Sequence, residues 1–145
     1  MSERPWTLKA PLRPRFRDTD AMGHINNAVY VTYIEVARQE YWRAFKGDNY
    51  RVVPFIFARV EMDFRSEALV HEQLELRIRC SFVGNKSFGF EYEIREATTD
   101  RLVVTASSVQ VFYDYTAKKS IPCPPGMRER LEAFEGRSLS REVSA

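Results

Sequence analysis

Two different spacings of hydrophobic residues divide the chain into one helix and a set of strands. Residues 7–17 alternate, with Leu12, Pro14 and Phe16 on one side and arginines on the other, and this period of two predicts an edge strand. Residues 28–46 instead repeat at three- and four-residue intervals, which predicts one long helix with a continuous apolar stripe. The stripe consists of Tyr30, Tyr33, Ile34, Ala37, Tyr41, Ala44 and Phe45.

The signals at the ends of this helix agree with its period. The side-chain oxygen of Asn26 or Asn27 is expected to cap the first turn, and Gly47 is expected to end the helix in a left-handed conformation. After residue 55 the period returns to two, which predicts four further strands joined by short turns. These strands run over 56–64, 74–82, 88–94 and 102–113.

Short turns require antiparallel neighbours, and a sheet with an apolar face needs a cover. We therefore expect an α+β domain in which one long helix is wrapped by a five-stranded antiparallel sheet. The 145 residues fit a single domain, 1–145, with its core at about 7–116 and a C-terminal extension at 117–145. In that extension, prolines stop the sheet, residues 127–134 suggest a short helix, and the polar tail from Gly136 is expected to fray.

Composition narrows the classes of function. Hydrophobic residues make up 44% of the chain and aromatic residues 13%, which suits wide apolar contact surfaces, while a net charge of +2 gives no reason to expect a nucleic-acid or membrane partner. The N-terminus has no apolar signal segment, and no apolar run is long enough to span a bilayer. Cys80 and Cys123 are expected to be free thiols in a reducing compartment, so we predict a cytoplasmic protein.

Several chemistries are disfavoured by spacing. The stretch GNKSFG, residues 84–89, has one residue too many for a serine nucleophile elbow and is followed by a strand where that motif needs a helix. There is no phosphate-binding glycine loop and no histidine or cysteine ligand set. A metal site at Asp18, Asp20 and His24 is conceivable, but these residues do not fix a coordination geometry. We predict neither a metal nor a cofactor.

The stretch DTDAMGHINN, residues 18–27, lies between the first strand and the helix. Asp20 precedes the helix start, where unsatisfied backbone N–H groups and the positive end of the dipole favour a developing oxyanion. A carboxylate facing such a start could attack a carbonyl or activate water. Equally, Asp18 and Asp20 could serve only to cap and charge the turn, and His24 could be a general base or a support for the turn.

A resemblance favours the catalytic interpretation. The segment RFRDTDAMGHINNAVYVTYIEVARQEYW, residues 15–42, resembles the opening of hot-dog-fold acyl-CoA thioesterases of the 4-hydroxybenzoyl-CoA thioesterase type. Their signature is D-x-D-x-x-G, then a polar turn, then a helix with Tyr and a Glu-x-x-Arg step. The matching residues here are Asp18, Asp20, Gly23, Tyr30, Glu35 and Arg38.

The resemblance implies roles for individual residues. Asp20 matches the catalytic carboxylate, the backbone N–H near Asn27 matches the group that polarises the thioester carbonyl, and His24 would orient the turn. Substrate-binding positions are expected at Gly23, Ala28, Tyr30 and Lys86, the last toward the nucleotide phosphates, although Gly84 and Asn85 replace neighbouring arginines of some members.

The predicted function is therefore hydrolysis of an acyl-CoA thioester by a homodimer or homotetramer. Acyl-carrier-protein thioesterases, which show Asp-x-Asn-x-His, are an alternative: Asp20 and His24 keep that spacing, but Met22 replaces the Asn. That alternative needs a basic surface for an acidic partner, with candidates at Arg13, Arg15, Arg17, Lys118 and Lys119. A non-catalytic acyl-CoA binder on the same fold is the third hypothesis, and Asp20 argues against it.

Overall fold

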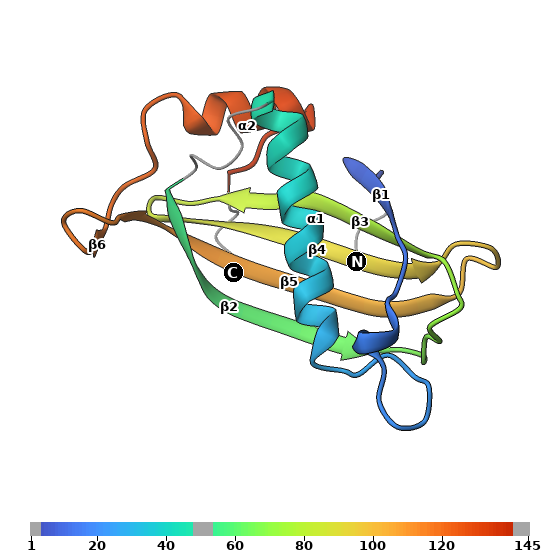
Figure 1. Cartoon of the computed structure of the whole chain (residues 1–145). Coiled ribbons are helices and arrows are strands. Elements are labelled where there is room, and N and C mark those ends of the chain that lie inside the picture. The colour runs from blue at the N-terminus through green and yellow to red at the C-terminus, as the bar shows by residue number, and fades with distance from the viewer. Residues whose placement is uncertain (1–3, 48–53, 141–145) are drawn as a thin grey trace.

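A computed structural model of the chain describes residues 4–47 and 54–140, and it shows one long helix lying across an antiparallel sheet (Figure 1). The sheet has the order β1-β3-β4-β5-β2, and the short strand β6 pairs with β5. The strands are β1 (Leu8–Leu12), β2 (Phe55–Phe64), β3 (Leu74–Val83), β4 (Ser87–Glu96), β5 (Leu102–Asp114) and β6 (Lys119–Ser120). The predicted α+β architecture is confirmed, with β6 as a sixth strand that the sequence pattern did not predict.

The helix α1 (Val29–Lys46) forms where the apolar stripe predicts it. Its buried side chains include Tyr30, Tyr33, Ile34, Ala37 and Tyr41, whereas Ala44, assigned to the same stripe, is exposed. The helix packs on the sheet through aromatic rings that meet edge to face. Tyr41 and Phe90, for example, lie 4.8 Å apart between ring centroids, and such pairs add to the burial of apolar surface.

The start of α1 differs from the prediction. The cap position is Ala28, and no side chain bonds to the first turn as a cap. Asn26 instead accepts a hydrogen bond on Oδ1 from the Ala28 N–H, at 3.0 Å. The expected end is confirmed in outline, since Gly47 is the C-cap at a positive φ of 66°.

Two irregularities in strand pairing change which side chains face the helix. The register of β2 on β5 shifts between Phe57 and Arg59, so Ile56 and Val60 do not share a face as a strict period of two predicts. The register of β3 on β4 shifts between Cys80 and Phe82, and Phe82 then pairs with Gly89. An extra residue in one strand of a pair turns the following side chains to the other face.

The C-terminal segment packs against the far end of β3. The second helix, α2 (Met127–Glu135), agrees with the short helix predicted there. The tail that follows does not fray at once: Leu139 is fully buried and its carbonyl accepts a hydrogen bond from the Val83 N–H, at 2.8 Å. The expectation of a frayed tail from Gly136 is wrong for residues 137–140, because this segment covers a stretch of β3 that β1 does not reach.

Candidate functional site

The polar stretch before α1 is anchored by Asp18. Its carboxylate is buried and accepts hydrogen bonds from the Tyr33 hydroxyl, at 2.6 Å, and from the Arg15 backbone N–H, at 3.0 Å. Burial alone disfavours the charged form, but these hydrogen bonds together lower the pKa of Asp18 below its usual value. Asp18 therefore fixes the path of the chain and does not face solvent.

One oxygen of the Asp20 carboxylate closes a tight turn. Its Oδ1 accepts from the backbone N–H groups of Met22, at 2.8 Å, and His24, at 3.1 Å. Gly23 makes the turn possible, because its φ of +82° lies in the left-handed region that side chains disfavour. The other oxygen, Oδ2, makes no hydrogen bond within the described part of the chain. One exposed carboxylate oxygen is thus held in place and left able to react.

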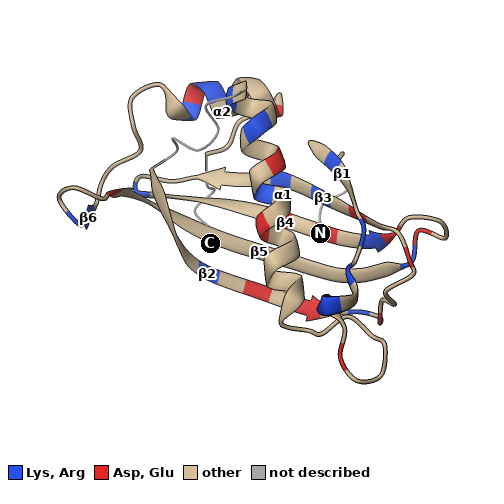
Figure 2. Cartoon of the chain, viewed as in Figure 1, with Lys and Arg blue, Asp and Glu red and all other residues tan. Residues whose placement is uncertain are grey.

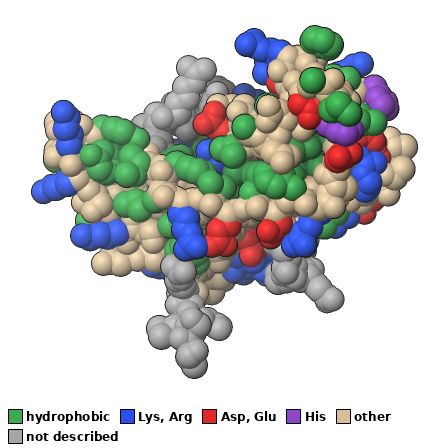
Figure 3. All heavy atoms as spheres, turned by 90° about the horizontal axis from the view of Figure 1, so that it is seen from below, with side chains coloured by type: hydrophobic (Ala, Val, Ile, Leu, Met, Phe, Trp, Pro, Cys, Tyr) green, Lys and Arg blue, Asp and Glu red, His purple; other side chains and the backbone are tan. Residues whose placement is uncertain are grey.

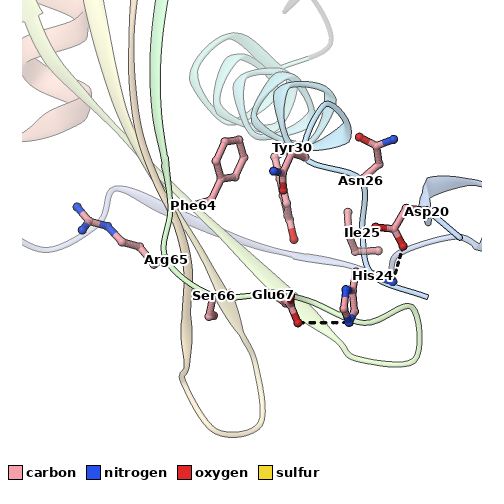
Figure 4. Close-up of a pocket in the computed structure, with 10 residues that line it drawn as sticks. Asp20, His24, Ile25, Asn26, Tyr30, Phe64, Arg65, Ser66 and Glu67 are labelled. Atoms are coloured by element: carbon pink, nitrogen blue, oxygen red, sulfur yellow. Dashed lines mark hydrogen bonds and ion pairs between the residues drawn. The ribbon is translucent and has the colours of Figure 1, made fainter. Parts of the chain in front are cut away.

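The loop after β2 forms the opposite wall of the site. His24 and Leu69 form an antiparallel bridge, and the Ile25 N–H donates to the Ala68 carbonyl at 2.9 Å. This pairing brings Glu67 opposite His24, with 3.2 Å between Glu67 Oε2 and His24 Nε2 (Figure 4). Two segments that are distant in the sequence thereby enclose one cavity.

The cavity has a volume of about 470 Å³. The turn and the helix start contribute one side of its lining, and the end of β2 with the following loop contributes the other. Its lining residues are Asp20, His24, Ile25, Asn26, Asn27, Tyr30, Phe64, Arg65, Ser66 and Glu67. The space suits a small organic group, since polar side chains and the aromatic rings of Tyr30 and Phe64 line it together.

The backbone at the helix start offers a donor to the cavity. The N–H groups of Ala28, Val29 and Tyr30 donate to the Asn26 side chain, the Asn26 carbonyl and the Asn27 carbonyl respectively. The Asn27 N–H has no acceptor among the residues that the structure describes. Because Asn27 lines the cavity at the positive end of α1, this N–H is a candidate donor to an oxygen of a bound molecule.

Aromatic side chains form the apolar part of the lining. The ring of Tyr30 points from α1 toward the loop at Ser66 and Glu67 (Figure 4), and its centroid is 5.8 Å from that of Phe64. Burial raises the pKa of Tyr30 to about 12, so its hydroxyl stays protonated at neutral pH. Arg65 also lines the cavity, but its guanidinium is turned away from Asp20 and His24 (Figure 4).

The predicted site residues are partly brought together. Asp20, His24, Asn27 and Tyr30 line the same cavity, whereas Gly23 and Ala28 shape the backbone around it without lining it. Lys86 is exposed in the turn between β3 and β4, at the opposite end of the sheet (Figure 1). A contribution of Lys86 to this cavity would have to come from a second copy of the chain.

Glu67 was not predicted as a site residue, since it lies just beyond the strand predicted over 56–64, where an exposed acid is ordinary. Its place in the site depends on the pairing of the turn before α1 with the loop after β2. No local sequence signal reports that pairing. Glu67 becomes a candidate site residue only once the turn before α1 and the loop after β2 are known to meet.

The described residues contain neither a clustered set of metal ligands nor a membrane-spanning helix. Among residues 4–47 and 54–140, no group of three or more His, Cys, Asp or Glu is arranged to hold a metal ion. Within the same ranges, no helix has the length and apolar character needed to cross a bilayer. Cys80 and Cys123 are free, as predicted.

Helix, sheet and cavity together define a hot-dog domain with a carboxylate beside the start of its helix. Solved thioesterases share this architecture. A thioesterase from Thermus thermophilus, described in complex with coenzyme A and Zn, is 29% identical, with a TM-score of 0.83 over 92% of this chain and 98% of that one. A predicted thioesterase from Bacillus stearothermophilus is 21% identical, with a TM-score of 0.78 over 92% of this chain and 98% of that one.

A family model described as the thioesterase-like superfamily matches residues 14–131, and the chain belongs to that superfamily. A curated relative, an uncharacterized protein named YsmA from Bacillus subtilis strain 168, is 28% identical over 80 residues. That match covers 54% of this chain and 54% of YsmA, so the chain spans about half the length of this relative. The superfamily and the structural neighbours support thioester hydrolysis as the class of reaction.

Proposed function

We propose that this protein hydrolyses the thioester of an acyl-CoA to a free acid and CoA. The observation that carries the proposal is that Asp20 and Asn27 line the same cavity, and that Asp20 Oδ2 and the Asn27 N–H each lack a hydrogen-bond partner among the described residues. Thioester hydrolysis needs a nucleophile or base on one side of the carbonyl carbon and a donor for the carbonyl oxygen.

Two routes are compatible with Asp20. In the first, Oδ2 attacks the carbonyl carbon, the C–S bond breaks with departure of the CoA thiolate, and water hydrolyses the mixed anhydride. In the second, Oδ2 takes a proton from a water molecule as that water attacks the carbonyl carbon, and the C–S bond then breaks with departure of the CoA thiolate, which takes up the proton. In both, the Asn27 N–H donates to the carbonyl oxygen as its negative charge grows. Hydroxylamine separates the routes, because it traps a mixed anhydride as a hydroxamate on the Asp20 peptide.

The choice of CoA is supported by the Thermus thermophilus relative, which is described with coenzyme A. That relative is also described with Zn, so the fit of a metal to this cavity has to be considered. Asp20 Oδ1 is held by two backbone N–H groups, His24 Nε2 faces Glu67, and the described residues contain no convergent ligand group. These residues do not fit a metal centre, and both routes proceed without one.

Hydrolysis of an acyl-carrier-protein thioester is the second candidate. Its expected basic surface would draw on the arginines near η1 (Phe16–Asp18) and the lysines at β6. These two groups lie at opposite ends of the molecule and do not form one patch on a single chain (Figure 2). An acidic carrier could therefore contact only one of them on each chain, which favours the acyl-CoA hypothesis.

Assembly into a homodimer or homotetramer is part of the proposal. β2 is an edge strand, and large hydrophobic side chains are exposed along it and on the neighbouring helix: Phe57 at 37%, Phe64 at 49% and Val31 at 41%. Figure 3 looks at the molecule from below, on the side of β2, and shows hydrophobic side chains gathered across that face. Exposed edges and apolar patches of this kind are commonly covered by another chain. Light scattering on the purified protein should give at least twice the 17.0 kDa of one chain.

The reaction class is tested by thiol release from a panel of aliphatic and aromatic acyl-CoA thioesters, with the same acyl groups carried on acyl-carrier protein. The proposal expects turnover of at least one acyl-CoA and slower turnover of its carrier-protein counterpart. Faster cleavage of the carrier-protein thioester would establish the second candidate instead. Binding of acyl-CoA without release of thiol would establish the non-catalytic hypothesis.

A further inference from the structure

His24 and Glu67 form a pair that joins the two walls of the cavity. The backbone around both residues is fixed: the His24 N–H donates to Asp20 Oδ1, at 3.1 Å, and the carbonyl of Glu67 accepts from Arg101 Nη2, at 2.9 Å. Only the last part of each side chain is free to adjust, and there Glu67 Oε2 lies 3.2 Å from His24 Nε2. These two backbone hydrogen bonds thus fix where the His24 and Glu67 side chains begin.

A second acid, Glu72, stabilises the loop that carries Glu67. Glu72 accepts on Oε1 from Arg101 Nη2 and from the Leu69 N–H, both at 2.8 Å. The hydrogen bond from Arg101 is the main cause that lowers the pKa of Glu72, so this support stays charged at neutral pH. Arg101 therefore ties the Glu67 backbone to Glu72, and the Glu67 carboxylate is left to face the cavity.

A carboxylate on one ring nitrogen of a histidine selects its tautomer. Glu67 Oε2 lies 3.2 Å from His24 Nε2, which favours the tautomer of the neutral ring that carries its proton on Nε2 and a lone pair on Nδ1. Without that partner the imidazole could turn or exchange tautomers, since its side chain is 31% exposed. The ring stands beside the turn that holds Asp20 (Figure 4), so its orientation affects the surroundings of the reacting carboxylate.

We propose that Glu67 is a positioning residue of this site, which holds the His24 imidazole in one orientation and one tautomer next to Asp20. This inference rests on the proposed function and adds to it a residue that the sequence did not indicate. Glu67 acts through His24 and takes no part in bond making or breaking. This role depends on the acceptor oxygen of the Glu67 side chain more than on its negative charge.

A double-mutant cycle tests that dependence. Glu67→Ala is expected to lower kcat by about tenfold (roughly 1.4 kcal/mol) with KM changed less than about twofold, and Glu67→Gln, which keeps an acceptor oxygen, is expected to stay within about threefold of wild type. In a His24→Ala background, Glu67→Ala should lower kcat by less than about twofold. Glu61→Gln, an exposed acid on the outer side of β2, is the matched control and should leave the rate unchanged. Equal losses from Glu67→Ala in both backgrounds would overturn the proposal.

Nitrogen NMR of the imidazole gives a readout that does not need activity. The chain has two histidines, so His71→Gln leaves His24 as the sole signal. The neutral ring should carry its proton on Nε2 in this background and in Glu67→Gln, and should mix tautomers in Glu67→Ala. If the tautomer is the same in all three, the contact does not position the ring and the proposal fails. If the tautomer responds but no acyl-CoA is cleaved, the pair stands and only the proposed function is lost.

Discussion

Replacing Glu135 by alanine is expected to destabilise the fold strongly, because this acid of α2 joins three distant parts of the chain. Its carboxylate accepts from the Thr7 hydroxyl at 2.7 Å, the Tyr41 hydroxyl at 2.6 Å and the Cys80 N–H at 2.9 Å. Cys80 stands at the irregularity in β3, where its N–H turns to this carboxylate instead of a neighbouring strand. Glu135 therefore satisfies a donor that the bulge would otherwise leave without a partner.

The magnitude follows from which donors remain buried after the substitution. Tyr41 and Cys80 are both fully buried, so neither donor can turn to water, and each buried unpaired donor costs about 1–3 kcal/mol. Thr7 is only partly buried and can be hydrated. The sum is roughly 2–6 kcal/mol, a large share of the 5–15 kcal/mol that is typical of a domain's stability.

Urea unfolding followed by circular dichroism measures this difference. Glu129→Ala is the matched control, since it removes an exposed acid from the same helix and should change the free energy of unfolding by less than about 0.5 kcal/mol. In a Tyr41→Phe background, Glu135→Ala should cost less, because one of the two orphaned donors is already gone. A loss from Glu135→Ala within about 1 kcal/mol of the control would refute the reasoning.

Two further predictions concern the anchor of the site and the irregularity in β3. Tyr33→Phe removes the hydroxyl that donates to the buried Asp18 carboxylate, and should cost about 1.5–3 kcal/mol near pH 7 in urea unfolding. Because the folded-state pKa of Asp18 is lowered, the stabilisation from its charged form is present above the unfolded pKa and is lost as the pH falls through the folded pKa. The difference in free energy of unfolding between wild type and Tyr33→Phe should therefore shrink in acid. A difference that stays constant with pH would contradict this. Gly89→Ala places a Cβ against the Phe82 ring and 2.7 Å from Ser81 Oγ, so it should cost about 1–3 kcal/mol in thermal unfolding. Phe82→Ala should remove most of that cost, and an unchanged cost would show that the ring is not the obstacle.

Local periodicity was sufficient to predict the helix and the four strands after it. The first strand, predicted over 7–17, is shorter than expected: β1 ends at Leu12, and Phe16–Asp18 form the 3-10 turn η1. The three- and four-residue spacing placed the helix at 28–46, and the structure has it at Val29–Lys46. The same spacing could not place the register shifts near Phe57 and Cys80, because a bulge adds one residue to one strand and is visible only against its partner. For the same reason Phe82, predicted on the face of Cys80, lies opposite Gly89 on the other face.

The site shows the same division between local and long-range information. Asp20, Gly23 and His24 form their turn with neighbours in sequence, and residue types alone indicated it. Glu67 joins the site through the bridge between His24 and Leu69, which depends on the fold of the whole chain. The oxyanion donor was predicted near Asn27, at the helix start. The Asn26 side chain accepts from the next N–H, that of Ala28, whereas the Asn27 N–H lacks an acceptor in the described part of the chain.

The most direct test of the proposed function is the kcat/KM of Asp20→Asn against wild type on the best acyl-CoA of the panel. Asparagine keeps the Oδ1 acceptor for the Met22 and His24 N–H groups, so the turn should persist while the reactive carboxylate is lost. The proposed mechanism predicts a loss of about 10²–10⁴-fold, as for removal of a general base, with unchanged circular dichroism. A loss of less than about tenfold, roughly 1.4 kcal/mol in transition-state stabilisation, would contradict it.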